Sequence, residues 1–209
     1  TMTRPTVLNA LALLSPSSLD QSQVASRLEK YLADPASVDS SVAPVILMSA
    51  ARRNDAALFA EFRSRLAAPK TPEQKSLMLR ALAEFTNPSL HDMYLDMTLS
   101  SEIRAQDAWM PYIWMLSNPD TRERTWNFVK TNWKALSAKL GPRGATRVVG
   151  AAGGLVTPAL KAEVDAFFRA PENEIEMARK TLDQTLESID LGLRFKEGQS
   201  ASFKSWVNK

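Results

Sequence analysis

Glycine is scarce in this sequence, and its distribution limits what the chain can fold into. Only seven glycines occur among 209 residues, and five of them lie between positions 141 and 154. Strand-rich folds need turn-forming residues at intervals of about 8–12 positions, and most of this chain lacks them. Alanine, leucine, glutamate, lysine and arginine, which favour helix, are abundant instead. The sequence therefore predicts an all-α fold.

Helix starts are marked by a polar capping residue followed by proline. Thr71-Pro72 is followed by Gln74, which completes the pattern of a capping box. The same cap-and-proline pair recurs at Asn87-Pro88, Asn118-Pro119 and Thr157-Pro158. These marks divide the chain into pieces of ordinary helix length. We predict helices over residues 19–33, 40–52, 54–67, 72–85, 88–100, 103–116, 119–140, 144–152, 158–169 and 173–197.

Short connections between so many helices imply that successive helices pack antiparallel. The spacing of the helix starts follows no exact period, which favours an irregular superhelix of stacked helical hairpins, like HEAT or armadillo arrays, over a strict repeat. We predict a lead-in or linker over residues 1–18, the superhelical domain over 19–197 and a tail over 198–209. The last predicted helix is expected to close the stack.

Composition excludes several classes of protein. The net charge is +3, from 26 basic and 23 acidic residues, which is too balanced to indicate nucleic acid by itself. No uninterrupted apolar run is long enough to span a membrane, and the patch at 7–14 is too short for a signal peptide. The compartment therefore stays open. Thr1 precedes Met2, which we interpret as the mark of a fragment of a longer protein.

Residues suited to catalysis are few. The chain has one histidine, His91, and no cysteine, although zinc sites draw heavily on both types. A zinc site would need His91 with Asp92 and Asp96, and a Ser-His-Asp triad would also need His91, without the G-x-S-x-G turn that usually carries the serine. We interpret His91 as a half-exposed helical histidine. We predict no catalytic residue, metal site or cofactor in this chain.

Two tryptophans on one predicted helix allow two interpretations. Interleaved with basic residues, Trp126 and Trp133 resemble a surface on which nucleic-acid bases stack. Their spacing of seven also places both on one helix face with Val129, which is the pattern of a core stripe. We favour the core, and with it no nucleic-acid partner.

Several segments, in their order along the chain, carry a family pattern. Residues 103–107 read IRAQD, residues 118–133 read NPDTRERTWNFVKTNW, and residues 163–168 read EVDAFF. Residues 50–55 and 71–82 also match. Together they resemble the C-terminal helical domain of aminopeptidase-N-type (gluzincin) zinc aminopeptidases, which include the endoplasmic-reticulum and puromycin-sensitive enzymes. The resemblance covers roughly residues 19–193.

The resemblance implies a non-catalytic role. In this family an H-E-x-x-H motif and a distant glutamate bind zinc, and a G-x-M-E-N segment binds the amino end of the substrate; this chain has none of the three. Zinc is thus expected only in the catalytic domain of a parent protein. In the family the C-terminal domain is an α-superhelical bowl that caps the catalytic domain, shapes the substrate chamber and can contact the far end of a peptide. The implied partners are the catalytic domain of the same polypeptide and a peptide substrate.

Two arginines within matching motifs are candidates for substrate contact, Arg104 and Arg122. A peptide carboxylate is well recognised by an arginine fork. In some relatives an arginine directly before the Asn-Pro pair touches the peptide, but here Ser117 holds that position. The alternative is that both arginines hold the turn together, by pairing with Asp107, Asp120 or helix carbonyls.

A different function with the same fold also stays open. An independent α-solenoid scaffold would bind a protein or peptide on its concave face, as helical solenoids commonly do. Such a scaffold would have no peptidase partner.

Overall fold

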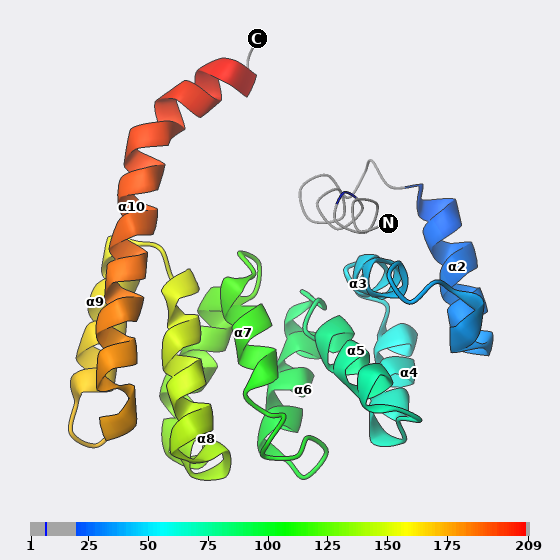
Figure 1. Ribbon diagram of the computed structural model, residues 1–209, viewed down its shortest axis with the longest axis horizontal. Helices are drawn as coiled ribbons and strands as arrows, with labels where there is room; N and C mark the ends of the chain where they lie inside the picture. Colours follow the sequence, from blue (N-terminus) through cyan, green and yellow to red (C-terminus); the bar gives the residue numbers. More distant parts are fainter. Residues whose placement is uncertain (1–6, 8–19, 208–209) are drawn as a thin grey trace. The chain divides into compact units, whose positions relative to one another are not determined.

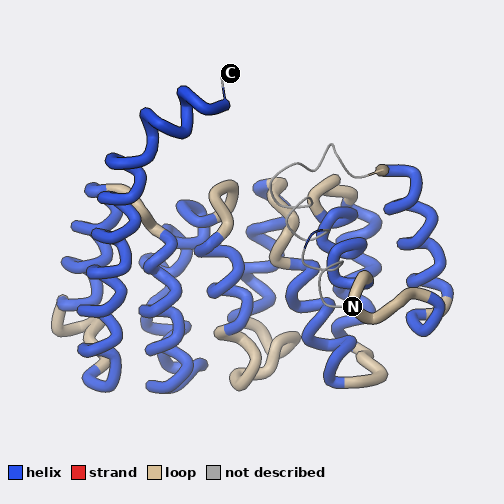
Figure 2. Tube along the Cα trace, turned by 45° about the horizontal axis from the view of Figure 1, so that its top comes forward, coloured by secondary structure: helices blue, strands red, loops and turns tan. Residues whose placement is uncertain are grey.

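The computed structural model describes residue 7 and residues 20–207, which form helices joined by turns (Figure 1). Within this part of the chain there is no strand, as Figure 2 shows, so the predicted all-α class is confirmed. The α-helices are α2 (Gln21–Ala33), α3 (Ala43–Ala51), α4 (Ala56–Ala67), α5 (Pro72–Leu82), α6 (Pro88–Leu99), α7 (Met110–Ser117), α8 (Arg122–Ala151), α9 (Pro158–Arg169) and α10 (Arg179–Val207). Short 3₁₀ turns are η2 (Pro35–Ser37), η3 (Ala152–Gly154) and η4 (Glu176–Ala178).

The chain divides into two compact units between Tyr94 and Leu95. The predicted boundaries, which set apart a lead-in over 1–18, a superhelix over 19–197 and a tail over 198–209, stay predictions. The lead-in lies outside the described residues, except for residue 7. In the described part of the chain, we find no helix with the length and apolar character that a membrane span requires.

The capping residues expected from sequence begin three of the helices. Thr71 Oγ1 accepts the Gln74 N–H at the start of α5, at 3.2 Å. Asn87 and Thr157 accept backbone N–H groups in the same way at the starts of α6 and α9. The capping box at Thr71 is displaced by one residue, because the Gln74 side chain accepts from the N–H of Lys70 rather than of Thr71. These side chains satisfy N–H groups that the helix leaves without partners.

The helix predicted over 103–116 is wrong in its first half, because α7 begins only at Met110. Residues 101–109 are turns. Pro111 has no N–H to donate to residue 107, so a continuous helix would lose that bond. The ammonium of Lys139 also binds the carbonyl oxygens of Ser100 and Ile103, the latter at 2.7 Å. These carbonyls are therefore satisfied without a helix.

The helix predicted over 119–140 begins three residues late, at Arg122. Asn118 Oδ1 accepts the N–H of Asp120 at 3.0 Å, and Thr121 Oγ1 donates to the carbonyl of Met115 at 2.9 Å. The Asn-Pro pair thus makes a turn rather than the first helical turn.

The end of that predicted helix is well placed. Gly141 has φ 64° and ψ 175°, which interrupts α8, and Pro142 follows it. Only glycine adopts this backbone conformation at low cost. The break separates the helical stretches predicted over 119–140 and 144–152.

In the unit before residue 95, the core combines aromatic packing with one polar contact. Phe59 and Phe62 pack edge-on against Phe85, with ring centroids 5.1 and 6.1 Å apart. The contact between the α3–α4 turn and the α5–α6 turn is made by polar side chains. We call this contact the polar joint; its residues are Arg52, Asn54, Arg80, Glu84, Thr86 and Asn87.

Two residues organise the polar joint. Glu84, 4% exposed, accepts from Arg52 Nη2 at 2.8 Å and from Arg80 Nη2 at 3.2 Å. Asn54 has a positive φ of 59°, which lets its side-chain oxygen accept the N–H groups of Thr86 and Asn87, each at 2.8 Å. Asparagine tolerates this conformation better than most residues.

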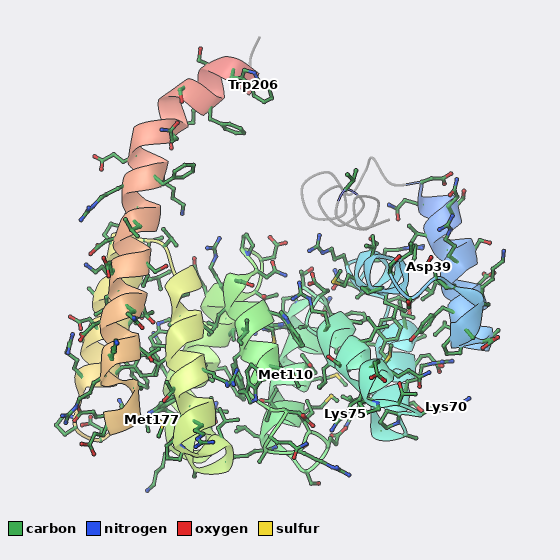
Figure 3. All side chains as sticks on the ribbon, in the orientation of Figure 1. Asp39, Lys70, Lys75, Met110, Met177 and Trp206 are labelled. Atoms are coloured by element: carbon green, nitrogen blue, oxygen red, sulfur yellow. The ribbon has the colours of Figure 1, made fainter. Side chains whose placement is uncertain are left out.

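The last helix differs from the predicted span of 173–197. The chain first makes η4, and α10 then runs from Arg179 to Val207. Its C-terminal part, red in Figure 1, extends past the N-terminal end of α9. Phe195, Phe203 and Trp206 are exposed there, and Figure 3 labels Trp206 near the end of the helix. This part of α10 thus buries none of its three aromatic side chains against the described residues.

Candidate functional site

The signature segments 118–133 and 163–168 meet in one aromatic cluster of the second unit. Trp126 and Trp133 of α8 contact Phe167 and Phe168 of α9; we call these four residues the aromatic cluster. The ring centroids of Trp126 and Phe167 are 5.4 Å apart, and those of Trp133 and Phe168 are 5.0 Å apart, in edge-to-face arrangements. Trp126 is 1% exposed. The predicted core role of both tryptophans is confirmed, and buried rings offer no surface for base stacking.

Each indole of the aromatic cluster also has a hydrogen-bond acceptor. Trp126 Nε1 donates to Glu163 Oε2 at 3.2 Å, and Trp133 Nε1 donates to the carbonyl of Asn173 at 2.9 Å. Lys130 donates to the same Glu163 oxygen at 2.6 Å. The hydrogen bond from Lys130, and next that from Trp126, lower the pKa of the Glu163 carboxyl. Three residues of the 163–168 motif, Glu163, Phe167 and Phe168, thus hold α9 against α8.

Arg122, the first predicted substrate-contact residue, is half-buried at the start of α8. Its Nη1 donates to the carbonyl oxygen of Gly154 at 2.8 Å. Gly154 in turn lies so close to the α7 C-terminus that a Cβ on it would overlap the carbonyl oxygen of Leu116. Arg122 therefore links the α7–α8 turn to η3. A hydrogen bond from this arginine to a helix carbonyl is one of the contacts that the alternative interpretation expected.

Arg104, the second candidate, is exposed in the turn before α7. Within residues 20–207 its guanidinium makes no hydrogen bond or ion pair. Its backbone carbonyl accepts the N–H groups of Asp107 and Ala108, which close the turn. The structure thus gives the two arginines different environments, one with a backbone partner and one open to solvent. Ser117, at the position before Asn118-Pro119, donates to the carbonyl of Trp114 in its own helix.

Sequence reasoning missed two residues that position this site. Lys139 of α8 fixes the turn that carries Arg104, through the carbonyls of Ser100 and Ile103. Burial lowers the pKa of its ammonium. Glu163 lies within a recognised motif, but its partners Trp126 and Lys130 are 37 and 33 residues away. No local signal identifies contacts between residues so far apart in sequence.

The environment of His91 differs from the expectation of a half-exposed histidine. His91 is 1% exposed, so the prediction is wrong. The residue is on the inward face of α6, where neighbours Leu90, Tyr94 and Leu95 are also buried. The described residues contain no group of three or more histidine, cysteine or acidic side chains that could hold a metal ion. The described residues therefore do not fit a zinc site.

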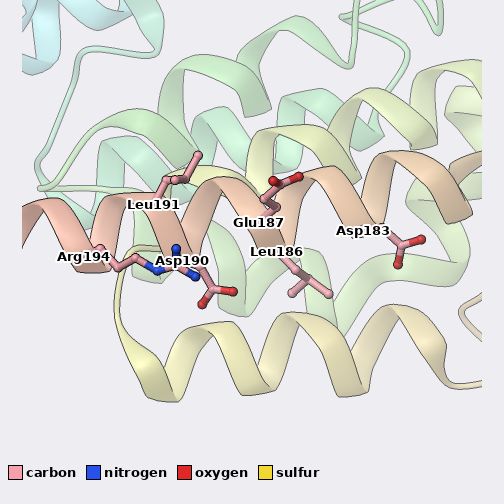
Figure 4. Close-up of a pocket in the computed structure, with 6 residues that line it drawn as sticks. All are labelled: Asp183, Leu186, Glu187, Asp190, Leu191 and Arg194. Atoms are coloured by element: carbon pink, nitrogen blue, oxygen red, sulfur yellow. The ribbon is translucent and has the colours of Figure 1, made fainter.

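A shallow groove of about 300 Å³ runs along α10. Figure 4 shows Asp183, Asp190 and Arg194 directed toward α9, with Glu187 on another side of the helix. Asp190 pairs with Lys161 and Asp183 pairs with Arg169, at 2.7 and 2.8 Å. These carboxylates hold α9 and α10 together, and the groove has no arrangement suited to acid–base chemistry.

Comparisons with known proteins agree with the sequence resemblance. The family described as "ERAP1-like C-terminal domain" matches residues 1–191. The chain is also similar to aminopeptidase 2, mitochondrial, of Saccharomyces cerevisiae, with 26% identity over 105 residues. This alignment covers 50% of the present chain and 11% of the yeast protein. The chain thus spans about a tenth of the length of the curated relative that it matches.

Proposed function

This chain belongs to the family of ERAP1-like C-terminal domains, and from that premise we propose that it is the non-catalytic C-terminal domain of a zinc aminopeptidase. In this role it caps the catalytic domain of the same polypeptide and shapes the chamber that holds the peptide substrate. The proposed arrangement of its helices is an irregular superhelix of HEAT-like hairpins.

The observation that carries the proposal is the contact between the signature segments. Trp126 and Trp133 from one segment pack on Phe167 and Phe168 from the other. The residues that identify the family therefore hold helices together and do not carry out chemistry. A domain whose recognisable residues are structural suits a covering role better than a catalytic one.

Substrate contact, if this domain provides it, falls to Arg104 rather than Arg122. Arg122 already donates to the carbonyl of Gly154, whereas the Arg104 side chain is exposed. An exposed guanidinium can form the two parallel hydrogen bonds that a peptide carboxylate accepts. We therefore assign a peptide-contact role to Arg104 and a structural role to Arg122.

Zinc belongs to the parent's catalytic domain in this proposal. Zinc sites of the H-E-x-x-H type take two histidines and a glutamate, with a second glutamate as general base. This chain has a single, buried histidine. Family membership also favours the domain role over an independent scaffold.

The test uses the 209-residue chain alone and together with a separately expressed catalytic portion of the parent enzyme. Alone, the chain is expected to hydrolyse no leucine p-nitroanilide and to hold no stoichiometric zinc by elemental analysis. Mixed with the catalytic portion, it is expected to co-elute in size-exclusion chromatography and to change the KM for peptides more than for the small anilide. One tightly bound zinc per chain, or no effect on peptide hydrolysis despite a correctly folded chain, would count against the proposal.

A further inference from the structure

A hollow of about 310 Å³ lies between the end of α2, the helix α4 and the start of α5, within the first unit. This volume is at the lower end of what small-molecule sites occupy. Its lining combines a phenol, two cationic side chains, one carboxylate, two uncharged polar side chains and apolar side chains. The polar groups that matter are Tyr31, Arg65 and Lys70.

Tyr31 contributes a hydroxyl with no hydrogen bond to any residue in the described part of the chain. The residue is 4% exposed, so little of its side chain reaches solvent. The hydroxyl oxygen is not among the fully buried polar atoms that lack a partner, so solvent reaches it from the hollow. Burial raises the pKa of the phenol, and Arg65 opposes that shift only in part. At neutral pH the Tyr31 hydroxyl is therefore a hydrogen-bond donor that faces the hollow without an acceptor among residues 20–207.

The Arg65 guanidinium is fixed by hydrogen bonds, but not all of its N–H donors have a partner among the described residues. Its Nε donates to Glu61 and its Nη2 donates to the carbonyl of Leu32, each at 2.6 Å. Its Nη1 makes no hydrogen bond with the described residues. The guanidinium is thus fixed by the protein and keeps donors for a further acceptor.

The charge of the lining favours an anion. Arg65 and Lys70 are cationic, and Glu61 is the single carboxylate among the lining residues. Lys70 is exposed in the α4–α5 turn, where Figure 3 labels it. Its ammonium makes no ion pair within the described residues. The lining as a whole carries one net positive charge.

Part of the remaining wall is apolar, and Ser64 and Gln74 add polar groups to it. Met78, which is buried, contributes to the apolar part together with Leu32, Pro35 and Ala68. A bare inorganic anion would leave this surface in contact with water. An anion with an apolar body would cover it and gain from the burial.

From these observations we propose that the hollow lined by Tyr31, Arg65 and Lys70 binds a small organic carboxylate that carries an apolar group. The carboxylate accepts from Arg65 Nη1, the Lys70 ammonium and the Tyr31 hydroxyl, and the apolar group lies on Met78. This site is independent of the proposed function, which rests on the aromatic cluster of the other unit.

The test is calorimetric titration of the 209-residue chain with 3-phenylpropionate, and with its neutral amide as the matched probe. For a probe of this size a Kd of about 0.1–1 mM is expected. The amide is expected to bind at least about tenfold more weakly, because it lacks the charge that the two cations recognise. A peptide that is blocked at its amino end and ends in phenylalanine with a free carboxylate distinguishes the two possible sources of the ligand, a peptide end and a free acid. Affinity equal to that of the acid indicates recognition of a peptide end, and weaker affinity indicates a free acid.

Two variants and one control test the assignment to this hollow. Tyr31→Phe and Lys70→Gln are each expected to raise the Kd about fivefold to tenfold. Neither should lower the melting temperature appreciably, because the two groups have no hydrogen-bond or ion-pair partner among the described residues to lose. Lys30→Gln, a neighbouring lysine outside the hollow, is expected to leave the Kd unchanged. The proposal is overturned if no saturable binding occurs below about 5 mM, if acid and amide bind equally, or if both variants keep the wild-type Kd.

Discussion

The polar joint and the aromatic cluster each hold one helical hairpin against the next, but they use different kinds of contact. The polar joint lies within the first unit and the aromatic cluster lies within the second. The polar joint depends on Glu84 between two arginines and on the Asn54 side chain. The aromatic cluster depends on four rings in edge contact. In these two contacts, polar groups fix a pair of turns, whereas apolar rings fix a pair of helix faces.

The two contacts should also fail differently. Rings buried from water stabilise through area and packing, so losing one leaves a cavity whose cost grows with its volume. A buried carboxylate between guanidinium groups contributes little net stability, but removing one partner leaves charge uncompensated. The polar joint is therefore a device for specifying one arrangement, and the aromatic cluster is a source of stability.

The largest effect is expected for Trp126→Ala. It removes the most buried ring of the aromatic cluster, together with its hydrogen bond to Glu163. We expect the free energy of unfolding to fall by about 3–5 kcal/mol, measured by urea denaturation with far-ultraviolet circular dichroism. Trp206→Ala is the matched control, because Trp206 is 72% exposed and should change stability by less than about 0.5 kcal/mol. Equal effects in the two variants would contradict the core assignment.

The next largest loss of stability is expected for Glu84→Gln. The amide cannot balance the charges of Arg52 and Arg80, so we expect a loss of about 3 kcal/mol. Glu163→Gln is the comparison, since its carboxylate is largely accessible and pairs at the surface with Lys130; a loss below about 1 kcal/mol is expected there. Chemical denaturation of both variants measures the contrast. If Glu84→Gln is as mild as Glu163→Gln, the polar joint is not a buried ionic contact.

Asn54→Ala should cost somewhat less, about 2–3 kcal/mol. It leaves the N–H groups of Thr86 and Asn87 without their acceptor and also forces alanine into a positive φ. Asn54→Gly separates the two causes, because glycine accepts the backbone conformation but cannot accept the hydrogen bonds. We expect the glycine variant to recover about 1 kcal/mol in thermal or chemical unfolding. No recovery would mean that the backbone conformation carries no strain.

The smallest effect is the pH dependence that Glu163 contributes. Hydrogen bonds from Lys130 and Trp126 place its pKa in the folded state below the unfolded value of 4.5. Its contribution is therefore complete above pH 4.5 and is lost as the pH falls through the lower folded-state pKa. Between about pH 5 and pH 3 the wild type should lose slightly more stability than Glu163→Gln, by less than about 1 kcal/mol given its exposure. Parallel pH profiles would show that the carboxylate does not contribute.

Sequence reasoning predicted the helical class, most helix starts and the burial of Trp126 and Trp133. It succeeded where the signal is local, as in the caps at Thr71, Asn87 and Thr157. It failed at the start of α7, where Lys139 binds carbonyls almost 40 residues away. It also misjudged His91, because a polar residue in an apolar helix gives no indication of which face the fold will bury.

The sequence by itself determined that this chain is helical, where most of its helices begin and which family it resembles. The first two properties follow from hydrogen bonds and side-chain periodicity within a few residues, whereas the resemblance rests on the order of the matching motifs. Only the tertiary structure decided which motif residues are committed to packing: it gave Arg122 a backbone partner, left Arg104 exposed and joined Glu163 to Trp126. The physical reason is that these contacts link residues 32 to 37 positions apart. Their partners are chosen by how the helices pack, which no local pattern encodes.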